Sequence, residues 1–134
     1  MRLSRVPPEL MMQHLNMFTG ALQLMADRCN GRYTLDDYID HINKTLMQLW
    51  VAIDDDNNIW ATAVSQIVQY PQRKAIQTVG CVGKNWREWY DLRLGIEEWG
   101  KTQGCDLAQG IAPRKWAPTF GDYKETHVLY EKDI

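Results

Sequence analysis

Two basic side chains beside a glycine, in the middle of the chain, suit phosphate binding. Gly83 precedes Lys84 and Asn85, and Arg87 follows two residues later. Asparagine is a common helix-capping residue, and a helix is predicted to begin at Trp86. The first turn of a helix has free backbone N–H groups, so this segment could bind a phosphate. A solvated helix start explains the same residues more simply, because such helix starts are common.

The residue types that bind metals are scattered along the chain. The three cysteines and three histidines show no Cys-x-x-Cys or His-x-x-x-His spacing, so no zinc site is predicted. The odd number of cysteines also argues against a disulfide framework. The acidic run Asp54-Asp55-Asp56 lacks the glycine and the distal glutamate of a calcium loop, and a polar turn explains it.

The first part of the chain is predicted to form a strand and then helices. Residues 2–6 read as a short strand, and the apolar spacing from residue 9 is helical, with Gly20 as a break between two helices. Asn30-Gly31 ends this helical region. Thr34 then begins a further helix that ends near Lys44, with Asp37 completing a capping box.

The second part is predicted to be a meander followed by a crossover. Strands are expected at 46–53, 59–69 and 74–82, the first two joined by a polar hairpin turn. A long helix is expected from residue 86 to 101. After it come a strand at 105–111, a short helix at 113–120 and a last strand at 123–131. The long helix presents one apolar stripe, made of Trp89, Leu92, Ile96 and Trp99.

Length and composition indicate one domain that spans residues 1–134, and the order of its predicted strands and helices indicates the α+β class. Of the 134 residues 45% are hydrophobic, enough for a single core. The formal net charge of −2 gives no support for a nucleic-acid surface. No apolar run of membrane-spanning length occurs, and residues 1–10 lack the apolar stretch of a signal peptide. We therefore expect a cytosolic protein without a membrane partner.

Several segments in the same order resemble a family of small tailed-phage proteins with the GNAT (acyl-CoA N-acyltransferase-like) fold. The resemblance covers roughly residue 46 to the end. It is carried by the stretches 49–54, 63–73, 96–99 and 104–106, by Trp116, and by 123–124 and 129–132. It implies a mostly antiparallel central sheet with a hairpin and meander, a long crossover helix after the third meander strand, and helices on both faces.

The resemblance also implies acetyl-CoA as the cofactor. In enzymes of this fold a glycine-rich loop before the long helix holds the pyrophosphate, and here Gly83, Lys84, Asn85 and Arg87 occupy it. The loop departs from the family pattern, because it lacks two closely spaced glycines and has Trp86 in the first turn. The family's general acid is a tyrosine after the fourth strand, for which Tyr123 is the nearest candidate. A tyrosine that packs its ring and hydrogen-bonds its hydroxyl is the simpler interpretation of Tyr123.

Two functions therefore stay open, and the sequence does not decide whether the protein is an enzyme. The first is a phage-encoded binding protein with a degenerate acetyl-CoA loop, associated with the virion or its assembly. Its partners would be other phage structural proteins or a host protein, in the host cytoplasm or in the virion. The second is an active acetyl-CoA-dependent N-acetyltransferase with an unknown acceptor. Its strand-end polar groups would accept the proton of the amine.

Overall fold

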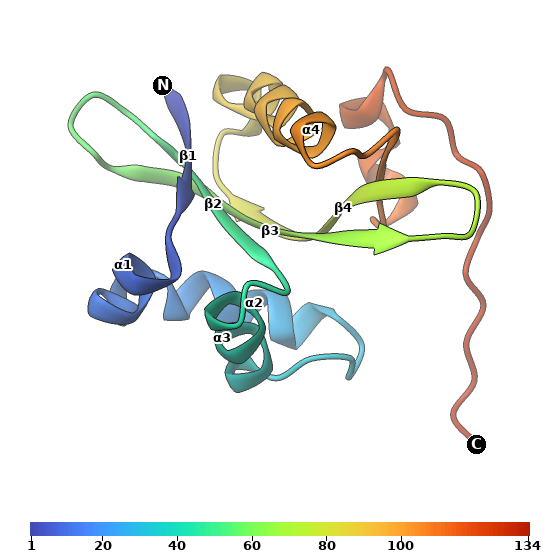
Figure 1. The fold of residues 1–134 in the computed structure, drawn as a ribbon, viewed down its shortest axis with the longest axis horizontal. Helices are drawn as coiled ribbons and strands as arrows, with labels where there is room; N and C mark the ends of the chain where they lie inside the picture. The colour runs from blue at the N-terminus through green and yellow to red at the C-terminus, as the bar shows by residue number, and fades with distance from the viewer.

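Five strands form one sheet in the computed structural model, which describes residues 1–134, and they lie across it in chain order (Figure 1). The first four strands are antiparallel neighbours, and β5 runs parallel to β4. The strands and α-helices are β1 (Arg2–Val6), α1 (Pro8–Gln13), α2 (Thr19–Arg28), α3 (Leu35–Asn43), β2 (Gln48–Ile53), β3 (Ile59–Gln69), β4 (Lys74–Gly83), α4 (Arg93–Thr102) and β5 (Leu107–Gly110). Four 3₁₀ helices are η1 (Leu15–Met17), η2 (Trp86–Glu88), η3 (Tyr90–Leu92) and η4 (Arg114–Phe120).

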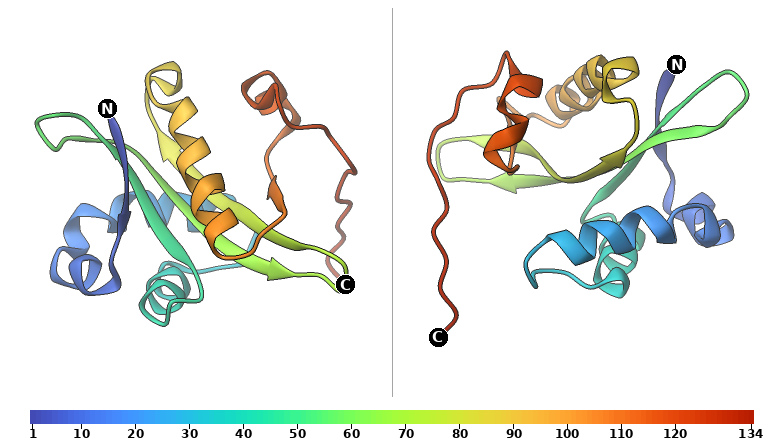
Figure 2. Two further views of the ribbon diagram at one scale, coloured as in Figure 1. Left: turned by 45° about the horizontal axis from the view of Figure 1, so that its top comes forward. Right: turned by 180° about the vertical axis from the view of Figure 1, so that it is seen from behind.

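Helices cover both faces of the sheet, as the sequence predicts. The helices α1, α2 and α3 lie on one face, while α4 and η4 lie on the other (Figure 2). Alternation along β2 explains why both faces are apolar, since Leu49 and Val51 point to α1–α3 and Trp50 points to α4. The sheet is therefore the middle layer of three.

The larger core lies between the sheet and the three N-terminal helices. Its buried side chains are Val6, Met11, Phe18, Leu22, Met25, Tyr38, Ile42, Met47, Leu49, Val51 and Val64. The smaller core lies under α4 and contains Trp50, Ile76, Ile96 and Cys105, with Trp99 packed against it. Most of the apolar burial is thus on the α1–α3 face, and the α4 face leaves room for a cavity.

One local prediction is confirmed and one is wrong in the N-terminal half. The Thr34 hydroxyl accepts the Asp37 N–H while the Asp37 carboxylate accepts the Thr34 N–H, which is a complete capping box. The predicted helix break at Gly20 is wrong, because Gly20 lies within α2. The chain leaves the helix at His14 instead (φ −132°, ψ 41°), and Phe18 then enters the core. One glycine costs a helix only about 1 kcal/mol, so α2 continues through it.

The long crossover helix is shorter than the sequence predicts. Asn85 takes a left-handed conformation with φ 54° and makes no side-chain cap. Residues 86–92 form η2 and η3, and the Trp89 indole N–H donates to the Lys84 carbonyl at 2.7 Å. This hydrogen bond folds the segment back toward the end of β4, so the α-helix begins only at Arg93.

The predicted last strand at 123–131 is wrong, because the structure has no strand after β5. The segment from Gly121 runs as an extended coil down one side of the molecule (Figure 1). Its polar side chains bind elsewhere: Asp122 to Arg93, and Glu131 to Arg32. These contacts hold the segment away from the ladder in which a strand would need to pair.

The turn between β2 and β3 is held by one carboxylate, which predicts an acid-sensitive hairpin. Asp54 accepts the Trp60 indole N–H at 3.0 Å and the backbone N–H of Asn58 at 2.9 Å, and these hydrogen bonds lower its pKa to about 2. A lowered pKa contributes stability above the unfolded pKa of about 4. That contribution should be lost between about pH 4 and pH 2.

We therefore expect Asp54→Asn to melt below the wild type at neutral pH and to match it near pH 2. Thermal unfolding followed by circular dichroism across this range measures the difference. Asp55→Asn is the matched control, because Asp55 is exposed in the same turn. A constant difference at every pH would show that the Asp54 charge does not hold the turn.

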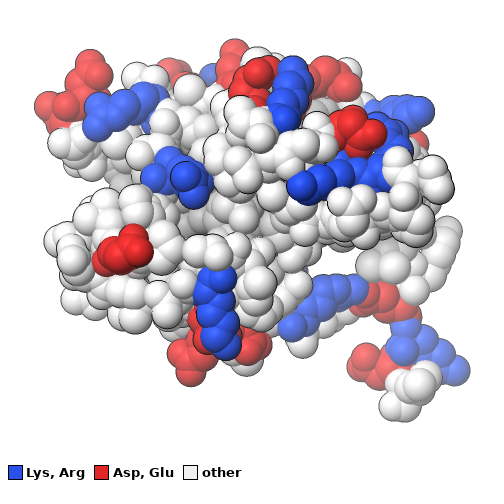
Figure 3. Space-filling model, viewed as in Figure 1, with Lys and Arg blue, Asp and Glu red and all other residues white.

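The surface carries both signs of charge. On the face drawn in Figure 3, Lys and Arg alternate with Asp and Glu, and neither sign fills a wide area. This agrees with the near-neutral net charge of −2. None of the helices combines the length and the apolar character that crossing a membrane requires.

Candidate functional site

The strands β4 and β5, at one edge of the sheet, part midway along β4, next to a bulge. The pairing of β4 with β5 ends at Thr78 and Gly110. The pairing of β4 with β3 changes register between Thr78 and Gly80, which makes Val79 an extra residue. A bulged residue has no ladder partner. Val79 is therefore unpaired toward β3, and it lies one residue beyond the end of the β5 ladder.

Close packing of α2 fixes the backbone on the other side of this bulge. A Cβ atom on Gly80 would lie 2.8 Å from the Met25 sulfur and 3.0 Å from its Cγ atom. A larger residue would force the Met25 side chain to move. The glycine inside a strand pattern was a sequence signal for a bulge or a close backbone approach.

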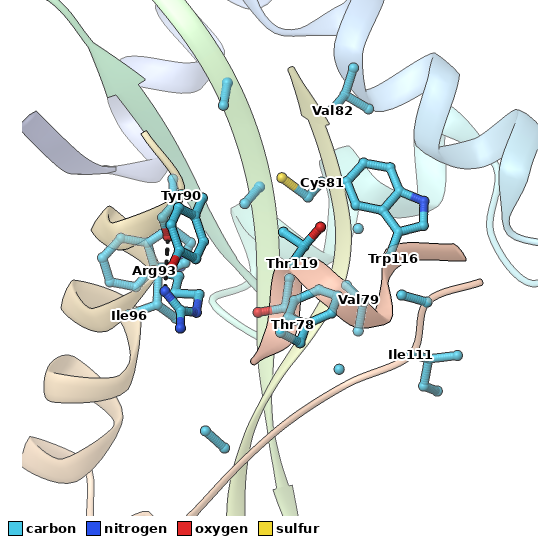
Figure 4. A pocket seen from close by; sticks show the side chains of 18 of the residues that line it. Thr78, Val79, Cys81, Val82, Tyr90, Arg93, Ile96, Ile111, Trp116 and Thr119 are labelled. Atoms are coloured by element: carbon cyan, nitrogen blue, oxygen red, sulfur yellow. Dashed lines mark hydrogen bonds between the residues drawn. The ribbon is translucent and has the colours of Figure 1, made fainter. Parts of the chain in front are cut away.

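A cavity of about 710 Å³ opens where the two strands part. Figure 4 shows Thr78 and Cys81 of β4 between Arg93 and Ile96 of α4 on one side and Trp116 on the other. Of its 31 lining residues 21 are hydrophobic, which is typical of small-molecule sites. The end of α2, on the other face of the sheet, also contributes Met25, Arg28 and Cys29. The cavity is thus lined from both faces.

The polar groups on the α4 wall bind the segment that follows η4. Arg93 donates to the Asp122 carboxylate at 2.5 Å, and its guanidinium carbon lies 4.7 Å from the centre of the Tyr90 ring. One helical turn further on, the Glu97 carboxylate accepts the Tyr123 hydroxyl at 3.1 Å. The Arg93 Nε–H is buried and has no hydrogen-bond partner. All four side chains are therefore paired, Arg93 with Asp122 and Glu97 with Tyr123, and one N–H of Arg93 is left without an acceptor.

Tyr123 reaches the cavity wall but is poorly suited to give up a proton. Burial, and then the negative charge of Glu97, raises the pKa of the Tyr123 hydroxyl far above its ordinary value. A general acid works best with a pKa near the operating pH. The geometry therefore favours the packed, hydrogen-bonded interpretation of Tyr123 over the catalytic one.

Cys81 is the reactive side chain that lies most directly in the cavity. Its thiol is open to the cavity, yet protein atoms surround it, and this burial raises its pKa to about 11. A thiol with so high a pKa is a weak nucleophile at neutral pH. Cys81 is therefore poorly suited to act as a catalytic nucleophile, but its chemical modification can serve as a probe of access to the cavity.

The residues predicted to bind the cofactor lie just outside this cavity. Gly83 is the last residue of β4, and Lys84, Asn85 and Arg87 come after it; none of the four is among the lining residues. A Cβ atom on Gly83 would lie 2.9 Å from the Trp89 ring, so an aromatic side chain fills the space beside it. The cations stack on neighbouring indoles, Lys84 at 5.7 Å from the Trp60 ring and Arg87 at 4.7 Å from the Trp86 ring.

Sequence reasoning missed other charged residues of the lining. Arg28 on α2 and Lys115 on η4 line the cavity and are both exposed. Arg28 is 56 positions from Lys84 in the chain, and nothing in its local sequence distinguishes it from an ordinary surface cation. Glu97 was likewise hidden in a solvated helix pattern, because only the folded chain brings it to Tyr123.

No protein-family profile matches the chain, and neither does any curated protein sequence. Solved structures do match over nearly its whole length. A tetramutant of the BH1408 protein from Bacillus halodurans matches with a TM-score of 0.69 at 12% identity, covering 100% of both chains. The aminoglycoside acetyltransferase meta-AAC0020, from an uncultured soil metagenomic sample and bound to trehalose, gives 0.72 at 11% identity, covering 99% of this chain and 95% of its own.

An aminoglycoside 6'-N-acetyltransferase from Acinetobacter baumannii, AAC(6')-Ih, gives 0.64 at 14% identity, covering 99% of this chain and 98% of its own. These three similar structures give no support for membership of a tailed-phage family. Identities this low show the fold alone. The parted β4 and β5, the helices on both faces and these structural neighbours together give one conclusion: the chain has the GNAT (acyl-CoA N-acyltransferase-like) fold.

Proposed function

We propose that this protein binds an acyl-CoA in the cavity between β4 and β5 and transfers its acyl group to an amine. The observation that carries the proposal is the unpaired Val79 at the point where both ladders end and the cavity opens. A backbone N–H without a ladder partner can donate to a carbonyl oxygen, and hydrogen bonds to an acyl carbonyl stabilise the negative charge that develops during transfer. The acetyltransferases among the structural neighbours support this choice of reaction.

The residues present fit the acyl arm of such a molecule better than its phosphates. A cavity of about 710 Å³ with a mostly apolar lining suits a flexible thioester arm. The loop after β4 is filled by Trp89, so the phosphate end needs other cations. Arg28 and Lys115 are exposed and line the cavity, and they would bind the phosphates. Bound acyl-CoA would supply the acyl group, whose C–S bond breaks as a bond to the amine nitrogen forms and the thiolate gains the amine's proton.

Acetyl-CoA is expected to raise the melting temperature. A ligand at a hundred times its dissociation constant stabilises the folded state by about 2.7 kcal/mol, which is a shift of several degrees for a domain of this size. Differential scanning fluorimetry with millimolar acetyl-CoA measures the shift, and CoA without the acetyl group tests the thioester's share. A melting temperature that does not move would reject the acyl-CoA proposal.

Single substitutions distinguish the two sets of cations. Arg28→Ala and Lys115→Ala should each weaken acetyl-CoA binding, because each removes one charge from the phosphates. Lys84→Ala and Arg87→Ala are the matched controls, since these residues lie outside the lining. If only Lys84→Ala and Arg87→Ala weaken binding, the phosphates bind instead at the loop that the sequence predicts, at Gly83, Lys84, Asn85 and Arg87.

The second candidate is a binding protein without catalysis, with a place in the virion or the assembly of a tailed phage. Two observations favour loss of catalysis: Trp89 fills the loop after β4, and the Tyr123 hydroxyl is engaged by Glu97. This candidate expects no melting shift with acetyl-CoA and the presence of the protein in purified phage particles. Proteomics that finds it in neither particles nor assembly intermediates would remove it.

A further inference from the structure

The C-terminal segment, residues 111–131, crosses the cavity and is tied to both of its walls. We call it the strap. Its first half lines the cavity through several side chains, including Ile111, Trp116 and Phe120. Beyond Tyr123 every residue of the chain is exposed. Residues 111–123 therefore cover the cavity without adding to either core, and residues 124–131 continue from it to the turn after α2.

One end of the strap is held on α4. Asp122 binds Arg93, and Tyr123 binds Glu97, at 2.5 Å and 3.1 Å. We call these two contacts the clasp. They join consecutive residues of the strap to side chains one helical turn apart on α4, so the strap is fixed to the wall that α4 provides.

The other end is held at the turn that follows α2. Glu131 pairs with Arg32, and its second carboxylate oxygen accepts the Asn30 side-chain N–H at 2.6 Å. We call these contacts the latch. Because α2 contributes Arg28 and Cys29 to the cavity lining, the latch lies beside the wall opposite α4. Clasp and latch thus bridge the two walls.

Only side chains hold the strap closed. From residue 114 onward no backbone hydrogen bond joins the strap to the rest of the chain; the backbone bonds there, such as Tyr123 N–H to the Phe120 carbonyl, are internal. The latch pair is well exposed, with side-chain exposures of 43% and 36%, and exposed ion pairs contribute little stability. The closed strap also leaves the Arg93 Nε–H buried without an acceptor, an unfavourable state that opening would relieve.

We propose that the strap is a lid: it opens by release of the latch and clasp, and this opening controls the entry of molecules into the cavity. The inference does not depend on which ligand the cavity takes. It makes Asp122, Tyr123 and Glu131 gating residues rather than residues of the chemistry. The lid also accounts for the position of Tyr123, because the hydrogen bond from its hydroxyl to Glu97 holds the strap on α4.

Alkylation of Cys81 by N-ethylmaleimide, followed peptide by peptide in a mass spectrometer, measures the opening. Cys81 lies in the cavity and is already partly accessible; opening would widen the access to its thiol and lower a pKa that burial raises to about 11. Cys105 is buried under α4 in the smaller core, so it reports on unfolding in the same sample. Near-neutral conditions keep both reactions slow enough to follow.

Glu131→Gln should accelerate the alkylation of Cys81 roughly two- to fivefold, and Asp122→Asn should do so more strongly because its partner is less exposed. Asp133→Asn removes the same charge two residues away, from a side chain with no described partner, and should leave the rate unchanged. Arg32→Glu should act like Glu131→Gln. The double variant Arg32→Glu with Glu131→Arg should restore the slow rate, because it rebuilds the pair with reversed charges.

Two results would overturn the lid. Wild-type rates at Cys81 in Glu131→Gln, Asp122→Asn and Arg32→Glu would show that the strap does not control entry. Equal acceleration at Cys81 and Cys105 would show that the strap is an integral part of the fold rather than a lid. Neither measurement uses acetyl-CoA, so failure of the lid proposal would not affect the proposed function, which the melting shift with acetyl-CoA tests separately.

Discussion

Replacing Trp99 with alanine is expected to lower the free energy of unfolding by about 3 kcal/mol. Trp99 lies on the sheet-facing side of α4 and packs against the smaller core, with its ring centre 5.6 Å from that of Trp50 at an interplanar angle of 72°. The Arg5 guanidinium covers its other side at 5.2 Å. This loss of stability is at the low end of the range of about 3–5 kcal/mol for replacing a core tryptophan with alanine, because the Trp99 ring is half-buried.

Thermal unfolding checks this prediction, and the melting temperature should fall by roughly 10 °C. The matched control is Trp86→Ala. Trp86 is also half-buried, but its described contacts are the ring of Tyr90 and the guanidinium of Arg87, outside both cores. Its loss should cost less than about 1 kcal/mol. An unchanged melting temperature in Trp99→Ala would mean that α4 does not depend on this ring, and would make the helix a docking surface for a partner.

The elements that the sequence predicts correctly are those that depend on neighbours in the chain. The strand Ile59–Gln69 matches its prediction at both ends, because alternation and turn chemistry both act locally. The capping box at Thr34 needs only Asp37, three residues away. The apolar stripe of the predicted helix is also confirmed at Ile96 and Trp99, whereas Trp89 and Leu92 precede α4 and belong to neither core.

The errors occur where distant contacts decide the conformation. A strand at 123–131 has a suitable pattern, yet a strand forms only beside a partner, and the polar ends of this segment bind α4 and the turn after α2. The sequence prediction of the candidate site is incomplete for the same reason. Tyr123 was identified from the chain, but Glu97, which captures its hydroxyl, lies 26 residues away and shows no pattern that would connect the two.

The bulge at Val79 and Gly80 is a feature that a sequence signal can indicate only in part. Gly80 within a strand pattern is typical of a bulge or a close approach, and here it is both. The sequence does not say, however, that β5 leaves the sheet at the same point. That coincidence creates the cavity, and it depends on the register of two strands about 30 residues apart.

A bulky side chain at position 81 is expected to abolish the response to acetyl-CoA. The Cys81 side chain points into the cavity two residues after the bulge, so Cys81→Trp places an indole where the thioester arm would lie. The new side chain enters open space rather than the packed core, so the variant should fold. The stabilisation of about 2.7 kcal/mol expected at a hundred times the dissociation constant should disappear.

Cys81→Ala is the control, since it keeps the cavity open and should retain the full melting shift. Isothermal titration of acetyl-CoA into both variants measures the affinity directly, and Cys81→Trp should lose at least about a hundredfold, because the blocked arm accounts for most of the apolar contact. Equal affinities in the two variants would place the acetyl-CoA elsewhere, and the loop at Gly83 to Arg87 would then be the next site to test. A loss confined to Cys81→Trp would tie binding to the gap between β4 and β5, because Cys81 lies on β4 where β5 has already left the ladder.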